Sequence, residues 1–223
     1  MPASLRMLCR FALLAMTLGI AAQAAAQENL TVNARFLLAA RNADAAGLKR
    51  GLADGAAVNS RNRLGESALI VVLKKNRVDL AQLLIDAGAD INQPALNGIT
   101  ALMAAAYEGQ TEMARQLLAK GANPVALDRL QKNAMIYAAG EGRTSVVTLL
   151  LANKVDPNAV YNNDLTALMW AAGFGKTDTV RALLAAGANP KLRDTRGKTA
   201  ADIAREQNFA ETAQLLDSAK SGG

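Results

Sequence analysis

The sequence predicts an all-α solenoid, in which helix-turn-helix units with short hairpin-like extended tips stack side by side. Three observations predict this architecture. Residue types recur every 33 positions along most of the 223-residue chain, and apolar residues follow helical spacing twice within each period. The chain is also 51% hydrophobic but only 4% aromatic. Its core must therefore be built from Ala, Leu, Val and Ile, which suits closely packed helices better than a β-sandwich.

Three ladders of equivalent residues define the period. The first holds residue types that cap helices, and it runs through Ser67, Thr100, Asn133, Thr166 and Thr199. The second is glycine at four of five positions, and it runs through Gly55, Gly88, Gly121, Lys154 and Gly187. The third is apolar and runs through Leu69, Leu102, Met135 and Leu168. Because no insertion interrupts the ladders, they predict one continuous stack.

The unit that begins near residue 95 shows the physical logic of the repeat. Thr100 is expected to cap a first helix over residues 101–107, which ends at Gly109. A second helix is expected over 111–120, closed by Gly121 in a left-handed conformation. Both helices are too short to be stable alone, so neighbouring units must stack. Lys154 replaces the closing glycine one unit later, where a positive φ costs on the order of 1 kcal/mol. We expect residues 152–160 to fray first.

This unit resembles the ankyrin repeat. The resemblance is carried by Gly98, Thr100-Ala101-Leu102-Met103, Gly109 and Gly121-Ala122-Asn123, and the same pattern returns over residues 166–189. The family consensus has Thr-Pro-Leu-His where this chain has Thr-Ala-Leu-Met, which explains how such a chain lacks histidine. We expect apolar packing by methionine to replace the polar link of that histidine. The resemblance covers about residues 29–218, and it implies a concave face of the kind that binds other proteins.

The caps place unit starts near residues 29, 62, 95, 128, 161 and 194, in a single domain over 27–223. The first and last units depart most from the pattern, as capping units with a polar outer side do. Residues 1–26 are predicted to be a cleaved signal peptide, because Arg6 and Arg10 precede an apolar run and Ala24-Ala25-Ala26 offers a cleavage site. The apolar run is too short to cross a membrane. A retained N-terminal anchor is the alternative.

Export predicts a bacterial periplasmic protein, with secretion beyond the periplasm as the alternative. The only cysteine, Cys9, leaves with the signal peptide, so the mature chain forms no disulfide. The mature chain has 23 basic and 19 acidic residues and no run of five Lys or Arg residues. This charge pattern disfavours nucleic acid as a partner. We expect a monomer without stable membrane insertion.

The composition also excludes most catalytic chemistry. Without histidine there is no His general base, no His-activated nucleophile and no His metal ligand. The segment Gly173-Phe174-Gly175-Lys176-Thr177 ends like a phosphate-binding loop, but Trp170 stands where that loop requires its first glycine. Ser67 lies near Lys74 and Lys75, yet it occupies a helix-cap position rather than that of a nucleophile.

Scattered carboxylates fit helix ends and turns better than a metal-binding loop, and they are Asp86, Asp90, Asp156, Asp164 and Asp194. We therefore predict no catalytic residue, no cofactor and no metal.

Outward positions predict the binding surface. On each first helix, the residues four, seven and eight positions after the cap share one outward face, which includes Gly140. With the tips, this face predicts a partner-binding groove of Arg63, Lys74, Lys75, Leu96, Asn97, Ile99, Tyr107, Glu108, Arg129, Lys132, Tyr137, Glu141, Asn162, Leu165, Trp170 and Phe174. Exposed aromatic residues are typical of binding hot spots. Alternatively, Tyr137 and Trp170 pack on each other and shield the first helices.

We therefore expect a non-catalytic scaffold that binds a protein partner through this groove. The basic residues at its edge favour a partner with acidic patches. An anionic envelope polymer or a small ligand is an alternative occupant, for which binding would depend steeply on salt. An immunity-type inhibitor or an accessory factor for a periplasmic enzyme remains open within the protein-binding hypothesis, because the fold does not choose among them.

Overall fold

The computed structural model describes residues 32–221, and the predicted signal peptide over residues 1–26 lies outside them. The described part is helical and confirms the predicted all-α solenoid. Helical residues 32–41 are followed by α2 (Ala45–Ala53), α3 (Ala68–Leu73), α4 (Val78–Asp86), α5 (Ala101–Glu108), α6 (Thr111–Ala119) and α7 (Ala134–Glu141). The chain continues through α8 (Thr144–Ala152), the 3-10 turn η1 (Asn162–Asp164), α9 (Ala167–Gly173), α10 (Thr177–Ala185), α11 (Ala200–Glu206) and α12 (Ala210–Ser221).

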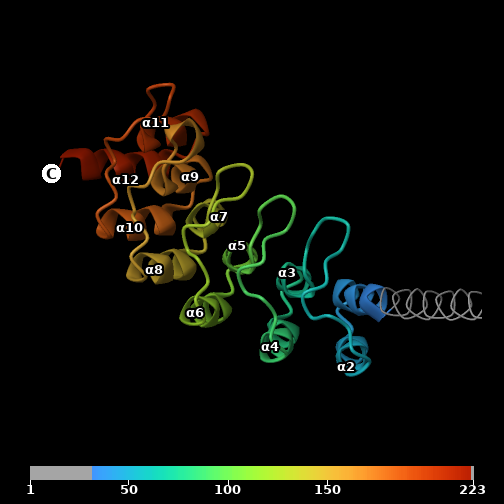
Figure 1. The fold of residues 1–223 in the computed structure, drawn as a ribbon. Coiled ribbons are helices and arrows are strands. Elements are labelled where there is room, and N and C mark those ends of the chain that lie inside the picture. Colours follow the sequence, from blue (N-terminus) through green and yellow to red (C-terminus); the bar gives the residue numbers. More distant parts are fainter. Residues whose placement is uncertain (1–31, 222–223) are drawn as a thin grey trace, which may run out of the picture.

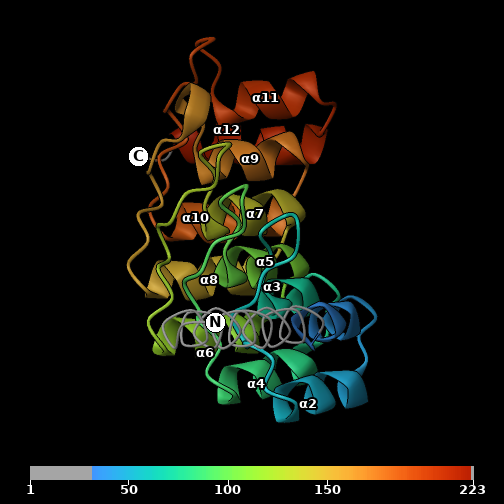
Figure 2. The ribbon, with the colours of Figure 1, turned by 45° about the vertical axis from the view of Figure 1, so that its right-hand side comes forward.

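The helices stand in two rows (Figure 1). The first helices of the units, α3, α5, α7, α9 and α11, form one row, and the second helices, α2, α4, α6, α8, α10 and α12, form the other. Figure 2 shows the same stack with the helices side-on, rising from α2 to α11. Neighbouring units pack first helix on first helix, as α5 does on α7 and α7 on α9. The units therefore share one continuous core.

Each first helix begins at a residue of the capping ladder. The side chains of Ser67, Thr100, Asn133, Thr166 and Thr199 each accept a hydrogen bond from the backbone N–H three residues later, at 3.1–3.4 Å. Met103 and Met169, which stand where the family has histidine, are 1% and 2% exposed. The core confirms the small-residue prediction, because the interior of α5 is packed with Ala101, Ala104, Ala105 and Ala106.

The connection from each second helix to the next first helix is called a finger here. The five fingers comprise residues 55–67, 88–100, 121–133, 154–166 and 187–199, and they project beyond the row of first helices (Figure 1). Every tip closes with the same backbone hydrogen bond across four residues, for example from Ala95 N to the Ile99 carbonyl at 2.8 Å. The tips are hairpin-like, as predicted.

Two kinds of hydrogen bond join neighbouring fingers. An asparagine oxygen accepts the backbone N–H of the next finger, in the pairs Asn59–Asp90, Asn92–Asn123 and Asn158–Asn189 at 2.7–3.0 Å. Nearer the tip, a carbonyl accepts the next backbone N–H, in the pairs Leu64–Leu96, Asn97–Arg129 and Asn163–Thr195 at 2.9–3.1 Å.

Within the described residues, neither kind of bond joins the third finger to the fourth. Val125 stands where the first, second and fourth fingers carry asparagine, and no hydrogen bond links Leu130 O to Asn162 N. On the fourth finger, Lys154, Asn163 and Asp164 take positive φ values of 64°, 61° and 56°. Among the fingers of residues 32–221, this seam is therefore the one junction without either of the regular hydrogen bonds.

Candidate functional site

The candidate site is the concave face, made by the fingers and by the outward side of the first helices. Its aromatic part comes from α5, α7 and α9, because Tyr107, Tyr137, Trp170 and Phe174 occupy the positions four, seven or eight residues after their caps. The Tyr107 and Tyr137 rings meet edge to face with centroids 6.2 Å apart. The Trp170 and Phe174 rings stack at 5.9 Å with an interplanar angle of 17°.

Lys132 links these two aromatic pairs. Its Nζ lies 4.2 Å from the centroid of the Trp170 ring and 6.0 Å from that of Tyr137. Within residues 32–221 the rings pair as Tyr107 with Tyr137 and as Trp170 with Phe174, so direct packing of Tyr137 on Trp170 is not how the face is built. A cation held between aromatic faces is stabilised by the ring quadrupoles. Lys132 is therefore engaged within the chain and is not a free charge at the edge of the groove.

Tyr137 is held in place by the third finger, which carries Asp128. Its hydroxyl donates to Asp128 Oδ2 at 2.6 Å, and Asp128 Oδ1 accepts the backbone N–H groups of Leu130 and Lys132 at 2.8 Å each. Burial, together with the hydrogen bond to Asp128 and the charge of that carboxylate, raises the pKa of Tyr137 far above its usual value. The hydroxyl therefore remains a donor, and the tyrosine presents a fixed ring to the concave face.

A hollow of about 280 Å³ lies beside Trp170 and Phe174, at the C-terminal end of this face. Its walls are mostly apolar and consist of Leu165, Met169, Trp170, Gly173, Phe174, Ile203, Gln207 and Arg196. Phe174 is 52% exposed. An exposed aromatic beside a small apolar hollow is suited to receive a side chain of a partner.

The last wall of this hollow was not predicted from the sequence. Ile203 and Gln207 lie four and eight positions after the cap Thr199, so they are the counterparts of Trp170 and Phe174. The positional rule that selected the aromatic residues would have found them if it had been extended to the last unit. The same rule placed Gly140 on the outward face, but Gly140 is buried, because the rings of Trp170 and Phe174 lie over it.

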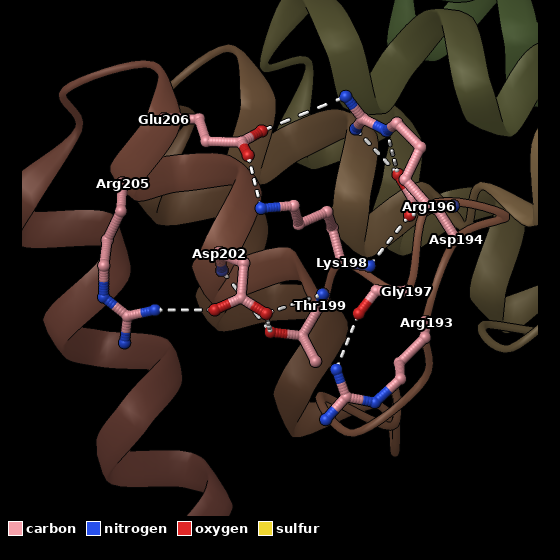
Figure 3. Close-up of polar contacts among 9 residues, drawn as sticks. All are labelled: Arg193, Asp194, Arg196, Gly197, Lys198, Thr199, Asp202, Arg205 and Glu206. Carbon is pink, nitrogen blue, oxygen red and sulfur yellow. Dashed lines mark hydrogen bonds and ion pairs between the residues drawn. The ribbon is translucent and has the colours of Figure 1, made fainter.

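The charged side chains around the rim of the hollow form ion pairs with one another (Figure 3). Arg196 donates from Nε and Nη2 to Asp194 Oδ2 at 2.9 and 2.7 Å, and Lys198 pairs with Glu206 at 2.8 Å. Burial opposes ionisation of Asp194, but hydrogen bonds from Lys198 N and from Arg196 outweigh it and lower the pKa of this carboxyl. The last unit therefore fixes Arg196 at the rim.

A second and larger hollow, of about 700 Å³, lies at the N-terminal end of the concave face. We call it the basic cleft, and its lining comprises Ala34, Leu37, Leu38, Arg41, Asn62, Arg63, Leu64, Glu66, Val71, Lys74 and Lys75. Three of the predicted groove residues, Arg63, Lys74 and Lys75, meet here. Leu38 and Arg41 were missed, although they stand four and seven positions after Ala34, which replaces the cap of the first unit.

Glu66 is the single carboxylate in the lining of the basic cleft. Its side chain is 12% exposed, and it accepts hydrogen bonds from Lys74 Nζ at 2.8 Å and Asn62 Nδ2 at 2.9 Å. Burial works against its ionisation, but these two hydrogen bonds and the charge of Lys74 prevail and lower the pKa of Glu66. Glu66 and Lys74 therefore neutralise each other.

The other predicted groove residues are spread along the face. Leu96, Asn97, Arg129 and Asn162 are exposed on the fingers, whereas Ile99 is partly buried against the core. Glu108 is half-buried at the end of α5, and Glu141 lines a separate depression near the turns that precede α8 and α10. The structure thus brings six of the predicted residues to the two hollows, places Tyr107, Lys132 and Tyr137 in the aromatic part of the face between them, and leaves these seven elsewhere.

No feature of the described residues points to catalysis by the motifs weighed above. Residues 173–177 run from the last residue of α9 through the turn to the first residue of α10, without a preceding strand. Asp90 and Asp156 accept backbone N–H groups two residues ahead, and no three carboxylates within residues 32–221 group as a metal site would require. Within the same residues, no helix has the length and apolar character needed to cross a membrane.

Comparison with known proteins gives a match at the level of the repeat. The family model described as "Ankyrin repeats (3 copies)" matches residues 24–128, 69–161 and 134–221. Together these matches cover all of the described residues, 32–221. No curated protein matches the sequence.

Proposed function

Since this chain belongs to the ankyrin-repeat family, whose repeats generally mediate contacts between proteins, we propose that it is a non-catalytic interaction scaffold of the bacterial periplasm. It binds a protein partner through the concave face. The observation that carries the proposal is the apolar hollow beside Trp170 and Phe174, whose rings remain accessible while the rest of the core is closely packed. Such a hollow supports binding of a large apolar side chain from the partner.

The proposal is tested by replacing one exposed ring. Phe174→Glu places a charge in the hollow without removing a buried core residue, since Phe174 is 52% exposed. Val78→Glu is the matched control, because Val78 is 39% exposed on the second-helix row. Pull-down from a periplasmic extract should recover the same partner with the wild-type protein and with Val78→Glu, and at least tenfold less with Phe174→Glu. Equal recovery by all three proteins would refute the proposal.

Trp170 offers a second readout, because it is the only tryptophan of the chain. Titration with the recovered partner should shift the emission of Trp170 as the hollow is covered. A partner that binds without changing this emission would bind elsewhere.

Export is a separate part of the proposal, and residues 1–26 support it by their pattern alone. Fractionation of the native host should find the protein in the periplasm, and N-terminal sequencing should begin at or near Gln27. A full-length chain in the cytoplasm would contradict this part and leave the binding proposal intact.

The basic cleft supports one alternative ligand, an anionic envelope polymer. Affinity for such a polymer would fall steeply with salt, whereas binding in the apolar hollow should depend on salt only weakly.

A further inference from the structure

We infer that the basic cleft binds an acidic segment of the partner, one in which Asp or Glu side chains alternate with apolar ones. This inference rests on the proposed function, because it assigns the chemistry of the partner at the opposite end of the same concave face. It depends on the charges of the cleft and on its apolar floor, which are independent of the aromatic hollow.

The charges of the cleft are unbalanced. Four cationic side chains, Arg41, Arg63, Lys74 and Lys75, line it together with the single carboxylate of Glu66. Glu66 is already paired with Lys74 at 2.8 Å. Arg41, Arg63 and Lys75 form no ion pair within residues 32–221 and are exposed. Like charges gathered around one hollow create a positive potential that attracts an anionic group.

The floor of the cleft is apolar. Leu37 and Val71 are partly buried against the core, while Leu38 and Leu64 are 52% and 65% exposed. A small anion would neutralise the cations but would leave these leucines in water. A peptide that carries both carboxylates and apolar side chains would satisfy the rim and cover the floor at once. The cleft, at about 700 Å³, has room for several such side chains.

The test uses the purified protein and labelled ten-residue peptides. One peptide alternates Glu with Leu, and its matched control alternates Gln with Leu. Fluorescence anisotropy should show that the Glu–Leu peptide binds at least tenfold more tightly than the Gln–Leu peptide, with an affinity that falls as salt is raised. Equal binding of the two peptides would overturn the inference, because the carboxylates would then contribute nothing.

Two charge-reversal variants locate the site. Arg63→Glu/Lys75→Glu changes the cleft, and Lys49→Glu/Lys120→Glu makes the same change in net charge at exposed positions outside it. The first variant should lose at least tenfold in affinity for the Glu–Leu peptide, and the second should remain within twofold of the wild type. Circular dichroism checks that both are folded. An equal loss in both variants would show that net charge alone attracts the peptide, and the inference would fail.

A polyphosphate chain serves as the competing ligand without apolar groups. If it binds as tightly as the Glu–Leu peptide and with the same dependence on Arg63 and Lys75, the cleft is a polyanion site and the inference is overturned. The Phe174→Glu variant separates the two proposals, because it should keep its affinity for the peptide. A partner that depends on Phe174 but not on the cleft residues would sustain the proposed function and refute the acidic-segment inference.

Discussion

The side-chain amide of Asn133 donates a hydrogen bond to the hydroxyl oxygen of Tyr161, 2.7 Å away, across the seam between the third and fourth fingers. Both residues depart from the repeat. Asn133 stands in a capping ladder otherwise made of Ser and Thr, and Tyr161 stands where Asn62, Asp128 and Asp194 begin other tips. Asn133 is 1% exposed, so its amide depends on this partner. The unusual residue at each position therefore supplies the hydrogen-bond partner of the other.

This pairing predicts strong coupling between the two positions. Tyr161→Phe removes the acceptor and leaves a buried amide without a partner, which should lower the free energy of unfolding by about 1–3 kcal/mol. In the double variant Asn133→Thr/Tyr161→Phe, a threonine cap replaces the orphaned amide, so the loss should be smaller than the sum of the single losses. Urea unfolding of all four proteins measures the coupling. Additive losses, within about 0.5 kcal/mol, would contradict it.

Much of the fold was predictable because it is specified locally and repeated. A cap such as Thr100 and a closing residue such as Gly121 each act within one turn of helix, and the 33-residue period supplies several copies of the same signal. The caps, the tips and the positive φ of Lys154 are all found as expected.

The site was predictable only in part, because its contacts join different units through long side chains. The repeat register placed Trp170 and Phe174 on one face, but it did not indicate that Lys132 would lie over the indole ring. A lysine side chain has many rotamers, and its partner is chosen by three-dimensional packing. The basic cleft was missed in part for another reason. The first unit has Ala34 instead of a cap, so its register was not extended to Leu38 and Arg41.

The stability of the protein should depend on pH through Asp79. Arg77 donates to both oxygens of this carboxylate at 2.8 and 2.6 Å, and these hydrogen bonds lower the pKa of Asp79 to about 2 from the usual 3.8. Arg77 also donates to the Ala43 carbonyl at 2.9 Å, so the pair joins neighbouring units.

The sign of the effect follows from the lowered pKa. The ionised carboxylate is favoured in the folded state, so its contribution is complete above the unfolded pKa near 4 and is lost as pH falls through about 2. Asp79→Asn should lower the melting temperature near neutral pH and converge with the wild type near pH 2. Asp178→Asn is the control at the same repeat position, where Asp178 forms no ion pair within the described residues. A constant difference between Asp79→Asn and the wild type over this range would refute the prediction.

Lys154 should be the site of a stabilising substitution. Its φ of 64° is one that glycine adopts freely, and the equivalent Gly121 and Gly187 have φ values of 86° and 87°. Lys154→Gly should raise the free energy of unfolding by about 1 kcal/mol by relieving this strain. Lys154→Ala is the control, because it removes the exposed side chain but keeps the Cβ that causes the strain. If urea unfolding shows both variants to be equally stable, the strain at Lys154 is negligible.

We predict that the stack opens first at the junction between the third and fourth fingers, where Val125 replaces asparagine. An asparagine there would be the counterpart of Asn158, which accepts from Asn189 N at 2.7 Å and donates to the Gly187 carbonyl at 3.1 Å. Val125→Asn should therefore bond to Asp156 N and the Lys154 carbonyl, and it should stabilise the fold by about 0.5–1.5 kcal/mol.

Amide hydrogen exchange tests this directly. In the wild type, the Asp156 amide should exchange faster than the amides of Asp90, Asn123 and Asn189, because each of those three donates to an asparagine of the preceding finger. Val125→Asn should slow exchange at Asp156 toward their rates. Val160→Asn is the matched control, since Val160 is 58% exposed beside 59% for Val125 but does not occupy the asparagine position. Equal slowing at Asp156 by both substitutions would mean that any exposed asparagine on these fingers protects the seam, and that the restored bond between the fingers does not.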